Sequence, residues 1–270
     1  MSGVHIAIAL GLTVLAGLST GIGSALSFFA KRTNTRLLSF SLGFSAGVMI
    51  YVSFVELFFK ARQALIEELG RTSGNSAVIT AFFLGIFFIG IIDRLVPSFE
   101  NPHEIRMVED MAKDMKNKVD GRLLRMGMLS ALAIGIHNFP EGIATFIAGL
   151  KDTGLGISIA IAIAIHNIPE GIAVSIPIFY ATGDKKKAFW YSFLSGLAEP
   201  FGALMGFMVL VRFLNDSLFG FLFAFIAGIM VFVALDELLP SAHEYGEHHL
   251  CIYGLVLGMA VMAVSLCILN

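Results

Sequence analysis

The sequence predicts an all-α integral membrane protein, with residues 1–270 forming a single transmembrane domain of eight helices. Three observations lead to this prediction. Hydrophobic residues make up 57% of the chain and charged residues only 14%, whereas a soluble domain carries about 25% charged residues. The apolar residues gather in eight runs, each long enough to cross about 30 Å of hydrocarbon at about 1.5 Å per helical residue. Most lysine and arginine residues lie in every second connection between these runs.

The eight runs define the expected helices in chain order. Lipid offers no hydrogen-bond partner to an open backbone, so each run should be helical. The first run is too long for the apolar core of a signal peptide and has no basic segment before it, so it should remain a membrane helix. Small residues such as Gly17, Gly43 and Gly196 should let the helices approach closely. The expected helices cover about 4–30, 37–60, 75–96, 123–149, 154–180, 187–213, 217–240 and 249–269.

Lysine and arginine set the expected orientation, because connections rich in these residues stay on the cytoplasmic side. The odd-numbered connections hold most of the 18 basic residues, including those of the longest polar segment, about 97–122. That segment should therefore be a cytoplasmic loop between the third and fourth helices. An even number of crossings then puts both termini on the outer side of the membrane. The net charge of −2 argues against a nucleic-acid partner.

The fourth and fifth expected helices carry the same pattern, His-Asn-x-Pro-Glu-Gly. One copy begins at His137 and the other at His166. At about 100° per residue, the histidine, asparagine and glutamate of each copy fall within one arc of about 100°. Two such faces turned toward each other would combine two imidazoles, two carboxylates and two amide oxygens, a mixture that favours first-row divalent transition metals. The predicted metal ligands from the two copies are His137, Asn138, Glu141, His166, Asn167 and Glu170.

A third carboxylate, Glu199, lies in the sixth expected helix and is followed by Pro200. An acidic side chain in the middle of a membrane helix costs about 2.5–3.5 kcal/mol on insertion scales. No lysine or arginine lies within the interior of the fourth or fifth helix to offset Glu141 and Glu170. A bound cation is therefore the simplest compensation. The alternative is a purely structural pairing of histidine with glutamate, which gives no reason for a duplicated pattern.

The prolines of the pattern predict a second feature. Pro140 and Pro169 each remove a backbone hydrogen bond inside a helix, which bends the helix. Gly142 and Gly171 follow the glutamates and should relieve crowding at the bends. The fourth and fifth helices are therefore expected to be kinked where they carry the ligands, at the centre of the bundle.

Other polar residues in or beside the apolar runs leave alternatives open. Ser53 and Glu56 lie three residues apart in the second helix, where they could complete the metal shell or line an exit path. Asp236, Glu237 and His243 lie near the seventh connection. They could relay metal at the cytoplasmic mouth or form an interfacial cap.

These residues resemble the ZIP family of divalent metal transporters and, within it, the bacterial zinc-uptake proteins. The resemblance covers essentially the whole chain and rests on the paired pattern, the eight runs and the long segment after the third. It implies a two-metal centre between helices four, five and six, with Glu141 and Glu170 bridging both metals and Glu199 as the ligand from helix six. Some relatives carry an acidic residue where this chain has Asn167. The resemblance also implies a multi-pass protein of the bacterial inner membrane.

The expected function is secondary transport that imports divalent metal into the cytoplasm, with zinc as the main substrate and iron, manganese, cobalt and cadmium as further ones. No G-x-x-x-x-G-K-[ST] pattern is present, so the ion gradient and the membrane potential would drive uptake. The chain is not expected to be an enzyme or to hold a prosthetic group, with an intramembrane metalloenzyme or a metal sensor as the alternatives. The expected partners are the metal ions and the lipid bilayer, with a homodimer as an alternative to a monomer.

Overall fold

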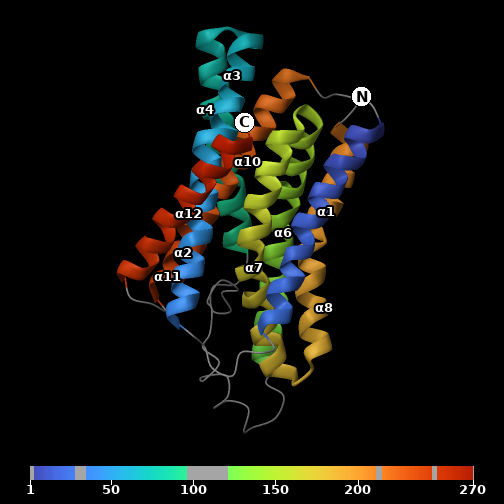
Figure 1. The fold of residues 1–270 in the computed structure, drawn as a ribbon, viewed down its shortest axis with the longest axis vertical. Coiled ribbons are helices and arrows are strands. Elements are labelled where there is room, and N and C mark those ends of the chain that lie inside the picture. The colour runs from blue at the N-terminus through green and yellow to red at the C-terminus, as the bar shows by residue number, and fades with distance from the viewer. Residues whose placement is uncertain (1–2, 28–34, 96–120, 211–214, 245–247, 270) are drawn as a thin grey trace.

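The computed structural model describes residues 3–27, 35–95, 121–210, 215–244 and 248–269 of the chain. Every secondary-structure element within these ranges is a helix, which confirms the predicted all-α class. Figure 1 shows long helices that run side by side along the long axis of the molecule. The predicted loop at about 97–122 falls almost entirely outside the described residues.

The helical stretches follow one another with short connections, and three of them contain a short π-helical segment, labelled η. The N-terminal elements are α1 (Gly3–Ser27), α2 (Thr35–Tyr51), η1 (Val52–Leu57), α3 (Phe58–Leu69) and α4 (Arg71–Leu95). The central elements are α6 (Gly121–Lys151), α7 (Thr153–Thr182), α8 (Lys185–Gly196), α9 (Ala198–Met205) and η3 (Gly206–Leu210). The C-terminal elements are α10 (Asp216–Val233), η4 (Ala234–Leu238), α11 (Leu239–Glu244) and α12 (His248–Leu269).

Seven helical stretches of the described residues are long and apolar enough to cross a membrane. They support the prediction of a multi-pass membrane protein. The first repeated pattern lies on α6, a helix of 31 residues, several of whose side chains fall outside the described part of the chain. The expected total of eight crossings, and the side of the membrane on which the termini lie, stay predictions.

The hairpin between α3 and α4 extends further than the apolar runs suggest. The sequence predicts a second helix that ends near residue 60 and a third that begins near 75, whereas α3 continues to Leu69 and α4 begins at Arg71. Leu65 is fully buried against α10, where a Cβ added at Gly220 would lie 2.6 Å from Leu65 Cγ. The helix continues because this face still packs, although the opposite face is polar. Gly70 makes the turn with φ of 78°, a positive value that glycine adopts without steric cost.

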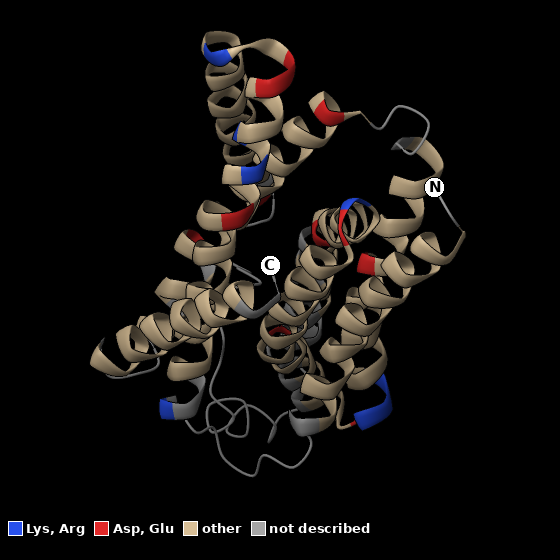
Figure 2. Cartoon of the chain, turned by 45° about the horizontal axis from the view of Figure 1, so that its top comes forward, with Lys and Arg blue, Asp and Glu red and all other residues tan. Residues whose placement is uncertain are grey.

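The helices form two groups that lie side by side (Figure 2). In the first group, α1 and α6 pack on α7, and α9 packs on α6. In the second group, α12 packs on α2, and α3 and α4 pack on α10. Contacts of α2 and α12 with α7 join the two groups. The repeated pattern and Glu199 all belong to the first group, so their relative positions depend on packing within it.

Glycines bring helix backbones into direct contact within each group. A Cβ added at Gly47 of α2 would lie 2.1 Å from the carbonyl oxygen of Leu255 in α12. A Cβ added at Gly171 of α7 would lie 2.0 Å from the carbonyl oxygen of Thr20 in α1. Side chains do not tolerate such distances, so any other residue would push these helices apart. The expectation that small residues allow close helix packing is confirmed at these contacts.

Candidate metal centre

The two copies of the repeated pattern meet at the contact between α6 and α7, and Glu199 joins them from the start of α9. Six of the seven predicted ligands are described with their side chains, and all six are buried. Glu170 is 5% exposed, and the fully buried ligands are Asn138, Glu141, His166, Asn167 and Glu199. His137 lies on α6, but its side chain falls outside the described residues, so its place in the cluster stays a prediction.

The imidazole of His166 links the carboxylates of the two copies. Its Nε2 atom lies 3.2 Å from Oε1 and 3.3 Å from Oε2 of Glu141 on α6. The same nitrogen lies 3.9 Å from Oε1 of Glu170, one turn further along α7. The pairing of His166 with Glu170 follows from their i, i+4 spacing on one helix face. The contact with Glu141 joins two helices and brings both carboxylates to a single imidazole nitrogen.

Asn167 links the carboxylate of Glu199 to α1. Its amide nitrogen donates a short hydrogen bond to Oε1 of Glu199 and a 3.0 Å hydrogen bond to the carbonyl oxygen of Ala16. Among the described residues, neither the amide oxygen of Asn167 nor Oε2 of Glu199 has a hydrogen-bond partner. A buried polar atom without a partner is costly. A cation beside these two oxygens would offset that cost.

Asn138 takes part in the cluster through its amide. When its nitrogen faces α7, the amide donates to Oε2 of Glu170 at 3.2 Å and to the carbonyl oxygen of Ile134 at 3.1 Å. In the opposite orientation the nitrogen reaches only the carbonyl oxygen of Ser195, at 3.4 Å. The first orientation makes two better hydrogen bonds, and an amide orientation is assigned from such a network. It leaves the carboxylate of Glu170 held from both α6 and α7.

The glycine that ends each copy serves helix packing. A Cβ added at Gly142 would lie 2.0 Å from the carbonyl oxygen of Glu199 and 2.6 Å from its Cα. Gly142 therefore lets α9 approach α6 closely enough to bring Glu199 to the cluster, and Gly171 does the same for α1 and α7. The sequence interpretation, that these glycines relieve crowding at a bend, stays a prediction beside this contact. Both α6 and α7 continue as helices through Pro140 and Pro169, and the expected kinks stay predictions.

The cluster gathers three acidic side chains within the membrane interior. Glu141, Glu170 and Glu199 contribute three carboxylates, while residues 126–150, 153–182 and 188–210 of the three helical stretches contain no lysine or arginine. Opposite charge therefore has to come from protons or from a bound cation. Carboxylate, imidazole and amide oxygen together are the ligands of first-row transition metals, so the ligand chemistry fits such an ion.

Several side chains of the cluster are paired with one another, and together they do not form a finished metal site. Among the described residues, no group of three or more histidine, cysteine, aspartate or glutamate side chains has an arrangement that could hold a metal ion. His166 is directed at Glu141, and Asn167 is directed at Glu199. An incoming ion would have to replace these hydrogen bonds through side-chain rotation. The assignment of individual ligands therefore stays a prediction.

The weaker candidates lie on the second group of helices. Ser53 and Glu56 are buried within η1, and Oε1 of Glu56 lies 3.7 Å from Nζ of Lys60. The hydroxyl of Ser53 has no hydrogen-bond partner in the described part of the chain. Asp236 and His243 are exposed, and the side chain of Glu237 is not described. The roles of these residues stay open predictions.

Sequence reasoning did not identify α1 as a part of the site. The carbonyl oxygen of Ala16 holds Asn167, and the hydroxyls of Ser24 and Ser192 form a chain that ends on the carbonyl oxygen of Gly171. These bonds join α1 and α8 to α7. The glycines of α1 indicated close packing, but not the helix on which α1 packs.

Comparison with known proteins adds to this geometry. A family model described as ZIP Zinc transporter matches residues 3–266. A protein named zinc transporter ZupT from Oceanobacillus iheyensis is 60% identical over 258 residues, which cover 96% of each chain. Proteins of the same name from Lysinibacillus sphaericus and Streptococcus mutans are each 59% identical, over 98% and 97% of each chain respectively. The chain is therefore similar to these proteins along nearly its whole length.

Proposed function

We propose that this chain, which belongs to the ZIP zinc transporter family, imports zinc ions through the buried cluster on α6, α7 and α9. Members of this family are transporters rather than enzymes, which disfavours an intramembrane metalloenzyme. The observation that carries the proposal is the burial of three carboxylates in helices whose spans hold no lysine or arginine. The relatives named as zinc transporters make zinc the first choice of ion.

The proposed main site uses His166, Glu141 and Glu170, together with His137. Two ligands of a tetrahedral zinc ion, each about 2.0–2.1 Å from the metal, are about 3.3 Å apart. Nε2 of His166 and Oε1 of Glu141 are separated by 3.2 Å. Once the hydrogen bond between them opens, small rotations let a zinc ion bind both atoms. The imidazole must be neutral to bind metal, so arrival of the ion releases any proton held between the pair.

A second proposed site lies toward α9 and uses only oxygen ligands. The partnerless oxygens of Asn167 and Glu199 support it, and Glu141, Glu170 and Asn138 would complete it. With Asn167 in place of an acidic residue, three carboxylates would face four positive charges if both sites filled. One ion should therefore bind tightly and the second more weakly, because excess charge is costly in a low-dielectric interior.

The membrane potential supplies the driving force in this proposal. Moving one elementary charge across 100 mV is worth about 2.3 kcal/mol, so a divalent ion gains roughly twice that on moving inward. The distribution of lysine and arginine supports an inner-membrane protein with both termini outside. Iron, manganese, cobalt and cadmium are proposed as further substrates, since the ligand mixture suits several divalent ions. A homodimer is proposed as an alternative to a monomer.

Uptake of radioactive zinc into proteoliposomes tests the proposal. The Glu141→Ala and Glu170→Ala variants should each lose uptake, because each removes charge that compensates the ion. Glu68→Ala is the matched control, since Glu68 is an exposed glutamate on α3. All three variants should elute like the unmodified protein in gel filtration. Zinc uptake near the unmodified level in either cluster variant would remove the basis of the proposal, and saturable binding without flux in the unmodified protein would indicate a sensor.

A further inference from the structure

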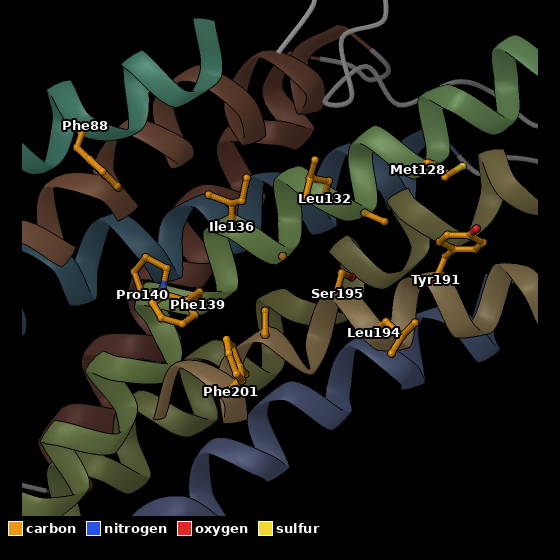
Figure 3. A pocket seen from close by; sticks show the side chains of 13 residues that line it. Phe88, Met128, Leu132, Ile136, Phe139, Pro140, Tyr191, Leu194, Ser195 and Phe201 are labelled. Carbon is orange, nitrogen blue, oxygen red and sulfur yellow. The ribbon is translucent and has the colours of Figure 1, made fainter. Parts of the chain in front are cut away.

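An apolar groove runs beside the metal centre between α6 and the α8–α9 stretch, with Phe88 of α4 at one end (Figure 3). It encloses about 540 Å³. Apart from Ser195 and the hydroxyl of Tyr191, its lining is apolar, and Figure 3 labels Leu132 and Phe139 among the side chains that line it. An apolar lining of this kind favours contact with hydrocarbon over contact with water.

The length of the groove matches one leaflet of a bilayer. Along α6 it extends from Pro140 to Met128, a separation of twelve residues, or about 18 Å at about 1.5 Å per residue. Half of the hydrocarbon core is about 15 Å. Phe139 and Pro140 of the repeated pattern line the inner end, next to the metal centre. The other end, at Met128 and Tyr191, points toward the start of α8.

Positive charge lies at the end of the groove that Met128 and Tyr191 form. Lys185, Lys186 and Lys187 form the first turn of α8, and all three are exposed. Lys187 lies one helical turn before Tyr191 and so on the same side of α8. Exposed lysines at the membrane surface attract anionic headgroups, at about 1 kcal/mol for each basic residue in general.

We propose that this groove is a binding site for one acyl chain of an anionic phospholipid, whose headgroup lies beside Lys185, Lys186 and Lys187. The chain fills the groove from the lysine end to Pro140. It touches Phe88 on the second helix group and Phe139 and Phe201 on the first, so it lies where the two groups adjoin. The site goes beyond the proposed function, since it concerns a lipid and not the carried ion.

Photocrosslinking of the full chain in nanodiscs tests this site. The probes are phosphatidylglycerol and phosphatidylcholine, each with a diazirine on one acyl chain, and labelled peptides are mapped by mass spectrometry. Phosphatidylglycerol should label the groove residues of α6 and α8 several-fold more than phosphatidylcholine. The lipid-facing side of α12 should be labelled equally by the two lipids.

Variants distinguish specific lipid binding in the groove from the lipid that surrounds any membrane protein. Ala131→Phe adds a ring inside the groove and should reduce labelling there, whereas Ala260→Phe, at an exposed alanine of α12, should not. Gly135→Leu is a second filling variant, because a Cβ at Gly135 meets no atom nearer than 4.0 Å. Replacing the three lysines with glutamine should abolish the preference for phosphatidylglycerol but keep labelling of the groove. Equal labelling by both lipids, or labelling that neither filling variant reduces, would overturn the proposal.

Discussion

Replacing Gly142 with alanine should displace Glu199 and weaken zinc binding. The added Cβ would lie 2.0 Å from the carbonyl oxygen of Glu199, and ordinary contact begins at 3.4 Å. The neighbouring atoms are backbone, so α6 and α9 must move apart rather than a side chain rotate. Supporting groups of metal sites typically change affinity by about 10–100-fold when they are lost. We expect a loss of this size in zinc affinity and a free energy of unfolding lowered by about 1–3 kcal/mol through overpacking.

Gly135→Ala is the matched control for this variant. Gly135 lies on the same helix two turns earlier, and its nearest neighbours, on Ala198 and Ser195, are 4.0 Å from an added Cβ. Alanine is favoured over glycine inside a helix by about 0.5–1 kcal/mol, so both variants share this gain. Only Gly142→Ala adds the steric conflict with α9.

The assay combines the zinc dependence of uptake in proteoliposomes with zinc affinity measured by calorimetry on the purified protein. Gly142→Ala should need about 10–100-fold more zinc for half-maximal uptake, while Gly135→Ala should match the unmodified protein. Equal zinc dependence in both variants would refute the claim that the contact between α6 and α9 positions Glu199.

Three further predictions concern the surroundings of the cluster. Asn167→Asp places a second carboxylate against Glu199, so the variant should be less thermally stable without zinc and gain more stability from added zinc. Metal analysis should also find its two occupancies more nearly equal; unchanged stoichiometry would contradict this. Zinc uptake should fall on acidification from about pH 7.5 to about pH 5.5 at a clamped potential, because protons compete with metal for imidazole, and a flat profile would count against histidine ligands. Ser192→Ala removes the hydrogen bond to the Gly171 carbonyl oxygen, which should lower stability by about 0.5–1.5 kcal/mol with zinc uptake retained; unaltered thermal unfolding would show that this bond adds nothing.

The ligand faces of α6 and α7 could be predicted from the sequence because helical periodicity alone determines them. His166 and Glu170 are one turn apart whatever surrounds them. The duplicated pattern in turn indicated that Glu141 lies near His166, and the structure brings them to 3.2 Å. Glu199 could be selected as a costly buried charge without knowledge of which helix it touches.

Other features depend on contacts between distant backbones, which local patterns do not encode. The hydrogen bond from Asn167 to the Ala16 carbonyl oxygen requires α1 to lie against α7. The steric role of Gly142 becomes visible only when α9 is in place. The extension of α3 to Leu69 depends on the close contact of Leu65 with Gly220, which lies far along the chain.

Anomalous diffraction at the zinc absorption edge, from crystals of the full chain grown with zinc, tests the central claim most directly. We expect a strong peak within about 2.0–2.2 Å of carboxylate oxygens of both Glu141 and Glu170, with a weaker peak toward Asn167 and Glu199. A crystal that holds zinc elsewhere, such as beside Glu56, and shows no peak between α6 and α7 would contradict it.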